Sequence, residues 1–180
     1  MNWIKLSSEY LSKHIYFTAR KDRCERPDGS IIDPYFVVEM PTSVCAMALT
    51  ENNEVIMVKQ YRHPVEETLL ELPGGFIDEG EEAQTAIGRE LLEETGYSFS
   101  KFTYLGKVAA NPGVLSNYTH LFLVSGGMKV AEQALDKNEE IVIELYPLED
   151  VRKLLQQNEI KQALHTTCLY MAFQKLDFEG

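Results

Sequence analysis

Three glutamates near the middle of the chain have the spacing of neighbours on one face of a helix. Glu90, Glu93 and Glu94 are three and four residues apart, and the surrounding sequence predicts a helix over residues 82–95 that ends at Gly96. The apolar residues of the first two turns fall on the same side of this helix: Ala83, Ala86 and Ile87. The acids continue the stripe that faces the core, so we expect them to point inward.

Carboxylates gathered in this way are unfavourable unless their charge is compensated. Like charges at helical spacing cost roughly 0.2 to 0.5 kcal/mol per pair, and anions in the last turn of a helix also oppose its dipole. A solvated acidic face is the ordinary explanation of a charge run, but acids that extend an apolar stripe do not fit it. A bound cation would remove the repulsion, and oxygen-only ligands suit Mg²⁺, with Mn²⁺ as the alternative.

The elements that must position these acids alternate in short pieces along the chain. The predicted strands cover residues 15–19, 35–40, 43–50, 54–61, 102–108, 120–124 and 141–145, and the predicted helices cover residues 82–95, 148–157 and 160–176. The first two strands are expected to form an antiparallel pair and the next two a hairpin. We therefore predict the α/β class, with a mixed sheet and helices packed outside it.

Bulk composition limits the partners. Of the 180 residues, 44% are hydrophobic and 25% are charged, as in an ordinary globular domain. The net charge of −11 argues against a nucleic-acid polymer as a partner, because proteins that bind one cluster Lys and Arg against phosphates. No apolar run approaches the ~20 residues that span a bilayer, and the first residues do not resemble a signal peptide. We therefore expect no membrane partner and a cytoplasmic protein.

The Nudix box is matched at every fixed position by Gly75, Glu81 and residues 89–97, which have the sequence Arg-Glu-Leu-Leu-Glu-Glu-Thr-Gly-Tyr. A signature of this length is far more specific than a lone glycine triplet. The resemblance implies a Nudix α/β/α sandwich with a mixed sheet, here with an amino-terminal antiparallel strand extension. Arg89 resembles the residue that orients a neighbouring glutamate in this family, with Glu81 as its partner.

The resemblance also assigns the metal ligands. Glu90, Glu93 and Glu94 match the carboxylates that bind divalent cations in Nudix hydrolases, and the carbonyl of Gly74 matches a further ligand in related pyrophosphatases. The chain is thus expected to be an enzyme that depends on Mg²⁺, with Mn²⁺ possible.

Outside the box the chain resembles the branch of ADP-ribose and nucleoside-diphosphate-sugar pyrophosphatases. Three features carry this resemblance: residues 60–65 (Gln-Tyr-Arg-His-Pro-Val), residues 70–75 (Leu-Glu-Leu-Pro-Gly-Gly) and Pro112. Arg62 and Pro112 are therefore expected to contact substrate, although a surface arginine at a strand end is the alternative for Arg62. Many ADP-ribose enzymes carry an acid after the proline, whereas this chain has Ser116 and Asn117, which leaves another sugar nucleotide open.

The branch implies hydrolysis of the diphosphate bond of a nucleoside diphosphate sugar to a nucleoside monophosphate and a sugar phosphate. Its general base often comes from a mobile loop, which favours Glu140 here, then Glu139, with Glu93 of the box as the remaining candidate. A solvated turn is the ordinary interpretation of such loop acids. Two other functions stay open: hydrolysis of another nucleotide, such as a dinucleoside polyphosphate, capped RNA or a modified nucleotide, and a Nudix module that senses a nucleotide without cleaving it.

The branch also implies how the chain is divided. Residues 1–40 are expected to form amino-terminal strands that pair two copies into a homodimer, and residues 41–180 are expected to form the Nudix hydrolase domain.

Overall fold

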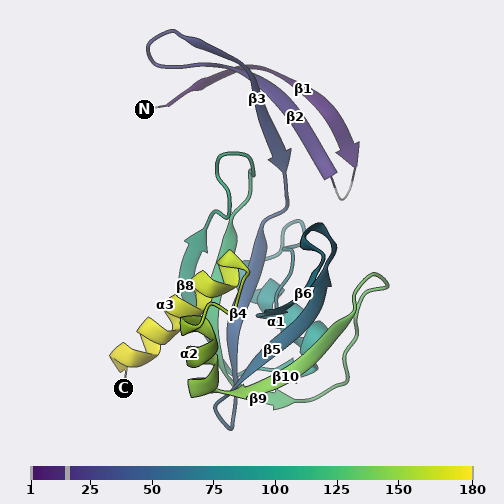
Figure 1. Cartoon of the computed structure of the whole chain (residues 1–180). Coiled ribbons are helices and arrows are strands. Elements are labelled where there is room, and N and C mark those ends of the chain that lie inside the picture. Colours follow the sequence, from purple (N-terminus) through teal and green to yellow (C-terminus); the bar gives the residue numbers. More distant parts are fainter. Residues whose placement is uncertain (1, 15–16, 180) are drawn as a thin grey trace. The chain divides into compact units, whose positions relative to one another are not determined.

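Two compact units make up the part of the chain that the computed structural model describes, residues 2–14 and 17–179 (Figure 1). The first unit comprises Met1–Pro41 and Ala109–Tyr118, and the second comprises Thr42–Val108 and Thr119–Gly180. The whole Nudix box lies in the second unit, so its carboxylates belong to one compact body.

The first unit is built on a three-stranded antiparallel sheet in the order β1 (Ile4–His14), β2 (Phe17–Glu25) and β3 (Ile31–Glu39). A turn at residues 26–30 joins β2 to β3, with Gly29 at φ +80°. The predicted antiparallel pair is confirmed for Thr18 and Ala19, which pair with Glu39 and Val38. Ile15 and Tyr16, which belong to the same prediction, lie outside the described residues.

One carboxylate is buried in this small sheet. Asp22 is 5% exposed, and it accepts hydrogen bonds from Ser8 Oγ at 2.6 Å and from Arg20 Nε at 3.0 Å. Burial alone would raise the pKa of Asp22, but the hydrogen bonds from Arg20 and Ser8 outweigh it and hold that pKa below its ordinary value. Arg20 also pairs with Glu39. The buried charge is therefore compensated within the unit.

The second unit contains a seven-stranded sheet in the order β10-β5-β4-β9-β7, with β6 beside β5 and β8 beside β9. Its strands are β4 (Ser43–Thr50), β5 (Glu54–Arg62), β6 (Glu67–Glu71), β7 (Tyr97–Ser98), β8 (Lys101–Val108), β9 (Thr119–Lys129) and β10 (Ile141–Pro147). A short 3-10 helix, η1 (His63–Val65), joins β5 to β6. β4 and β5 form the predicted antiparallel hairpin, whereas β4 and β9 run parallel, so the predicted mixed sheet is confirmed.

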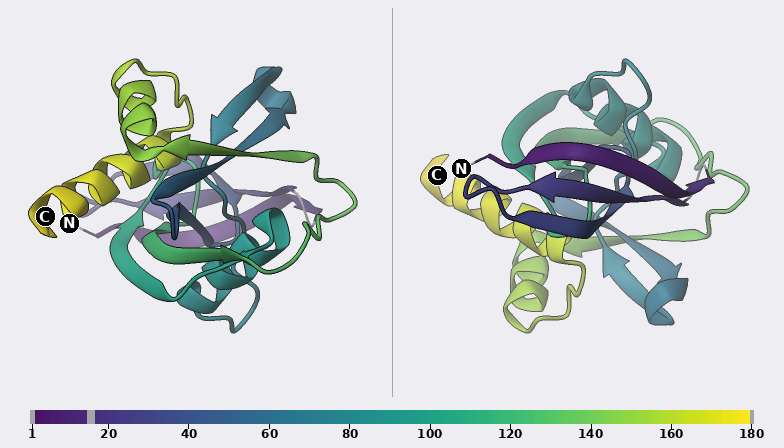
Figure 2. Two further views of the ribbon diagram at one scale, coloured as in Figure 1. Left: turned by 90° about the horizontal axis from the view of Figure 1, so that it is seen from below. Right: turned by 90° about the horizontal axis from the view of Figure 1, so that it is seen from above.

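Both faces of the central strand β4 are covered, which explains its almost continuous apolar sequence. Its odd-numbered residues pack with α2 (Leu148–Gln156) and α3 (Ala163–Glu179), and its even-numbered residues pack with α1 (Ala83–Thr95). Figure 2 shows α1 on one side of this sheet and the other two helices on the opposite side. The predicted α/β/α sandwich is therefore confirmed.

The helices end and begin for identifiable reasons. α1 ends as predicted at Gly96, which has φ +74° and donates its N–H to Leu92 O. α3 begins at Ala163 and not at residue 160 as predicted, because Asn158 has φ +59° and Ile160 is buried ahead of the helix. No helix in the described part of the chain is long and apolar enough to cross a membrane.

Candidate active site

Arg89 holds the acids of the box together. Its Nε and Nη2 donate to the two carboxylate oxygens of Glu81 at 3.0 and 2.9 Å, and its Nη1 donates to Glu90 Oε1 at 2.9 Å and Glu93 Oε2 at 3.1 Å. Nη2 also donates to the carbonyl of Phe76 at 3.0 Å. The pKa of Arg89 is raised by these acids, above all by Glu81. The geometry therefore gives Arg89 the orienting contacts that the sequence predicts.

Two of the three predicted metal carboxylates point inward from α1. Glu94 is 6% exposed and Glu90 is mostly buried, whereas the side chain of Glu93 is 45% exposed. The inward orientation expected for Glu93 is thus only partly present, because its carboxylate is drawn to Arg89 one turn earlier on the helix. The carboxylates of Glu90 and Glu94 form the buried end of the acidic stripe.

The buried acids lack enough positive charge. The pKa of Glu94 is raised to about 8, chiefly by burial and also by the charges of Glu90 and Glu139, against the opposing effects of Gly74 and Arg62. Burial is also the largest influence that raises the pKa of Glu90, with Glu93 and Glu139 adding to it and Arg89 opposing it. The site carries more negative charge than its own arginines offset.

Two glycines let the backbone run against these carboxylates. Gly74 has φ +153° and donates its N–H to Glu94 Oε2 at 2.9 Å, while a Cβ at this position would lie 2.2 Å from the carbonyl oxygen of Val44. A Cβ on Gly75 would lie 2.5 Å from the carboxyl carbon of Glu90. In residues 73–75, hereafter the glycine loop, a side chain at Gly74 would clash with the backbone of β4, and a side chain at Gly75 would displace the carboxylate of Glu90.

These residues fit a divalent cation. The donor set is oxygen only, its buried acids need positive charge, and Gly75 places no side chain of its own against the carboxylate of Glu90. In the described part of the chain, no three His, Cys, Asp or Glu side chains are already arranged around one point. The carboxylates of Glu90 and Glu93 are instead turned to Arg89, so metal binding would require them to reorient.

The loop before β10 is tied to the end of α1. Gln133 Nε2 donates to Glu94 O at 2.7 Å, and Ala134 N–H donates to Glu93 O at 2.8 Å, which satisfies carbonyls that the helix leaves without partners. Of the two predicted loop acids in the described residues, Glu139 is the one whose charge acts on both Glu90 and Glu94. Glu140 adjoins the first residue of β10. The charge of Glu139 therefore acts on the buried acids of the box, and the choice between the two loop acids stays a prediction.

Arg62 lies beside the box but is already paired. Its Nη2 donates to Glu71 Oε2 at 2.6 Å and its Nε contacts both oxygens of that carboxylate at 3.1 Å. Glu71 is 1% exposed, whereas the side chain of Arg62 is 44% exposed. The sequence interpretation does not include Glu71, although a lone acid between two leucines in a strand is a usable signal for a buried partner.

A buried histidine contacts the chain just before the glycine loop. His165, in the first turn of α3, accepts the N–H of Leu72 at Nδ1 over 3.1 Å. Burial, together with the smaller effect of the charge of Arg62, lowers the pKa of His165 to about 3. His165 is therefore neutral and can accept this hydrogen bond. The sequence offers no signal for this contact, because the two residues are 93 positions apart.

The remaining predicted substrate residues belong to the first unit. The segment of residues 112–117 lies alongside β3: Val38 donates its N–H to Val114 O and accepts the N–H of Ser116. Ser116 Oγ accepts the N–H of Met40 at 3.4 Å, and Asn117 Nδ2 donates to Pro41 O at 2.9 Å. Among the described residues, Asn117 Oδ1 is a buried side-chain oxygen without a hydrogen-bond partner.

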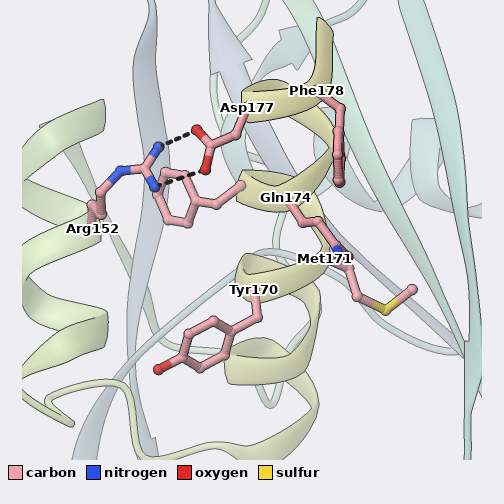
Figure 3. A pocket seen from close by; sticks show the side chains of 7 residues that line it. Arg152, Tyr170, Met171, Gln174, Asp177 and Phe178 are labelled. Atoms are coloured by element: carbon pink, nitrogen blue, oxygen red, sulfur yellow. Dashed lines mark hydrogen bonds and ion pairs between the residues drawn. The ribbon is translucent and has the colours of Figure 1, made fainter.

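A hollow of about 520 Å³ lies elsewhere in the second unit, between α2 and α3. Figure 3 shows Arg152 and Asp177 joined across it by hydrogen bonds of 2.9 and 3.3 Å. It is lined by none of the predicted site residues. It therefore contributes nothing to the site on α1.

A mixed sheet between helices, with an arginine-bound set of carboxylates against a glycine loop, defines the Nudix class of hydrolase fold and site. The NUDIX domain model matches residues 40–166, so the chain belongs to the Nudix family. A second family model, the nucleoside diphosphate sugar hydrolase N-terminal domain, matches residues 3–38.

Relatives agree with this assignment. The ADP-ribose pyrophosphatase of Bacillus subtilis is 36% identical over 71% of this chain and 69% of its own length. The ADP-ribose pyrophosphatase of Mycobacterium tuberculosis is 30% identical over 88% of this chain and 77% of its own length. A crystal structure of an ADP compounds hydrolase covers 100% of this chain and 97% of its own with a TM-score of 0.85, and at 22% identity it supports the fold alone.

Proposed function

We propose that this chain hydrolyses the diphosphate bond of a nucleoside diphosphate sugar, of the ADP-ribose type, to a nucleoside monophosphate and a sugar phosphate. The observation that carries the substrate class is the match of residues 3–38 to the nucleoside diphosphate sugar hydrolase N-terminal domain, directly before the NUDIX domain. Relatives with the name ADP-ribose pyrophosphatase support the same substrate class.

Glu90, Glu94 and the carbonyl of Gly74 would hold a divalent cation, Mg²⁺ or Mn²⁺, with Glu93 as a further ligand. When bound, such a cation neutralises diphosphate charge and makes water a stronger nucleophile at neutral pH. Arg89 keeps the box acids close to one another without being consumed in the reaction.

Glu139 is the proposed general base, with Glu140 as the alternative. It takes a proton from the attacking water as the new oxygen–phosphorus bond forms and the bridging oxygen–phosphorus bond breaks. The position of Glu139 within electrostatic reach of Glu90 and Glu94 supports this role. Arg62, whose guanidinium Glu71 fixes on one side, presents the rest of its planar fork to a phosphate or a sugar.

Three residues of the first unit, Pro112, Ser116 and Asn117, are also proposed to contact substrate. Asn117 Oδ1 is a buried acceptor that a hydroxyl or amine of the substrate would satisfy, with Pro112 and Ser116 beside it in the sequence. The neutral amide and hydroxyl favour hydrogen bonding to a sugar over contact with a cationic group.

The same unit is proposed to pair two copies of the chain. β1 is the outer strand of its sheet, and residues 4–11 are all exposed, with the apolar members Ile4, Leu6, Tyr10 and Leu11. An exposed apolar strand at a sheet edge is a template for pairing. Light scattering tests this proposal: the intact chain is expected at twice 20.5 kDa, and a monomer at micromolar concentration would contradict it.

A turnover screen tests the function itself. ADP-ribose, ADP-glucose, GDP-mannose and dinucleoside polyphosphates are incubated with Mg²⁺ or after exhaustive chelation, and the products are separated by chromatography. We expect a monophosphate and a sugar phosphate in the presence of Mg²⁺ only. Full activity after chelation, or inorganic pyrophosphate released from a triphosphate as the main product, would contradict the proposal. Tight binding of a nucleotide without turnover would instead favour a sensor.

A further inference from the structure

The glycine loop is held by hydrogen bonds from several elements. Ala46 N–H of β4 donates to Pro73 O at 3.2 Å, and Val44 N–H of the same strand donates to Gly75 O at 2.8 Å. From the other side, Gly74 N–H donates to Glu94 of α1. In the described residues, no hydrogen bond to the carbonyl of Gly74 accompanies these contacts, so this oxygen is available as a ligand.

The chain enters this loop through Leu72, which is 2% exposed. A buried backbone N–H needs an acceptor, because leaving it without one destabilises the conformation that buries it. The sheet does not supply that acceptor: β6 ends at Glu71. The acceptor is Nδ1 of His165, reached from α3 on the opposite face of the sheet from α1.

We propose that His165 is a positioning residue of the proposed metal site: by accepting the Leu72 N–H it fixes the peptide plane between Glu71 and Leu72, from which the chain enters the glycine loop, and thereby helps to place the carbonyl and the N–H of Gly74. This inference rests on the proposed function, since it concerns the proposed Gly74 ligand. α3 is a rigid base for the contact, because Cys168, Leu169 and Ala172 are buried in the core beneath it. Partners outside the ligand shell typically change metal affinity by about 10- to 100-fold when removed.

Three variants separate positioning from general packing. His165→Leu removes the acceptor, whereas His165→Asn keeps an acceptor oxygen where Nδ1 stood. Leu169→Ala is the matched control, one turn further along the same buried face of α3, and it opens a cavity in the core that also holds Leu72 while it keeps the imidazole of His165. Binding of Mn²⁺ is measured without substrate, by electron paramagnetic resonance titration of free Mn²⁺, together with the melting temperature of each variant.

We expect His165→Leu to weaken Mn²⁺ binding at least about tenfold, His165→Asn to stay close to the wild-type affinity, and Leu169→Ala to melt earlier yet bind normally. Equal Mn²⁺ affinity of His165→Leu and the wild type would overturn the inference alone. A wild type that binds no Mn²⁺ would overturn the proposed function and this inference with it. Equal weakening in His165→Leu and Leu169→Ala would assign the effect to packing and also overturn it.

A second measurement serves if His165→Leu does not fold. In ¹⁵N-labelled wild-type protein, a scalar coupling across the hydrogen bond should join the Leu72 amide nitrogen to Nδ1 of His165. Presence of this coupling, and its persistence when a diamagnetic divalent cation such as Mg²⁺ is added, supports the inference. Absence of the coupling would overturn it.

Discussion

Asp22 and Glu94 are almost equally buried, at 5% and 6% exposure, yet their pKa values are shifted in opposite directions. The pKa of Asp22 is held low because Arg20 and Ser8 donate to it and outweigh the effect of burial. The pKa of Glu94 rises to about 8 because burial and two neighbouring acids outweigh a single backbone N–H and a distant arginine. The structural carboxylate of Asp22 is paired with the cation of Arg20, whereas the carboxylate of Glu94, a proposed metal ligand, has too little positive charge around it.

The largest expected effect is at Glu94. Glu94→Gln should lower turnover by about 100-fold or more, because a ligand carboxylate is lost while the amide oxygen can still accept the Gly74 N–H. The metal-free protein should be no less stable, because an uncompensated buried charge is removed. Steady-state kinetics measure the turnover and thermal unfolding measures the stability of the metal-free protein, with exposed Glu82→Gln as the control for both. Marked destabilisation of Glu94→Gln with near-normal turnover would mean that Glu94, like Asp22, has a structural role, and it would contradict the comparison.

The next effect separates the two loop acids. Glu139→Gln should cut turnover by about 100-fold with little change in the Michaelis constant, because a base acts on the bound substrate only. Glu140→Gln, the neighbouring control, should retain most of the activity. The reverse ranking would return the role to Glu140. Near-normal turnover in both variants would leave Glu93 as the base.

The smallest effect is at Asp22. Asp22→Asn should lower the free energy of unfolding by about 1 kcal/mol or more at pH 7, because hydrogen bonds to a charged acceptor are lost. The folded-state pKa of Asp22 is depressed, so its stabilisation is present above the unfolded value of about 3.9 and is lost as pH falls through the folded value. The difference between wild type and variant should therefore close below about pH 4. Chemical denaturation across this range measures it, with exposed Glu9→Gln as a control that changes little.

The sequence was sufficient for the arrangement of α1. A helical wheel places Glu90 and Glu94 on the stripe of Ala86 and Ile87, and the structure buries all four at least in large part. Glu93 departs from that pattern because a wheel gives only the direction of the Cα–Cβ bond, whereas Arg89 decides where the carboxylate ends. The periodicity of the sequence therefore predicts which face of a helix a residue lies on, but not which partner its side-chain atoms bind.

Contacts between elements that are far apart in the sequence could not be predicted from it. His165 and Leu72 meet only because α3 and β6 pack on one core, and no spacing in the chain encodes that meeting. β1 was missing from the predicted elements for a different reason: its residues 4–11 are exposed, so the apolar and polar alternation that marks a half-buried strand has nothing to face within this chain.

The burial of β4 on both faces also governs how the protein comes apart. Local openings in proteins begin where few apolar contacts hold the backbone, and the most covered strands open last. The N–H groups of Val44 and Ala46, at the start of β4, hold the glycine loop, so that loop is fastened to the strand with the most resistance to opening. Fluctuations that bend the loop before β10 or fray the end of α1 can move Glu93 and Glu94, which lie in the last turn of that helix, but they leave the glycine loop in place. On heating, the glycine loop is therefore expected to lose its place only when the sheet itself unfolds.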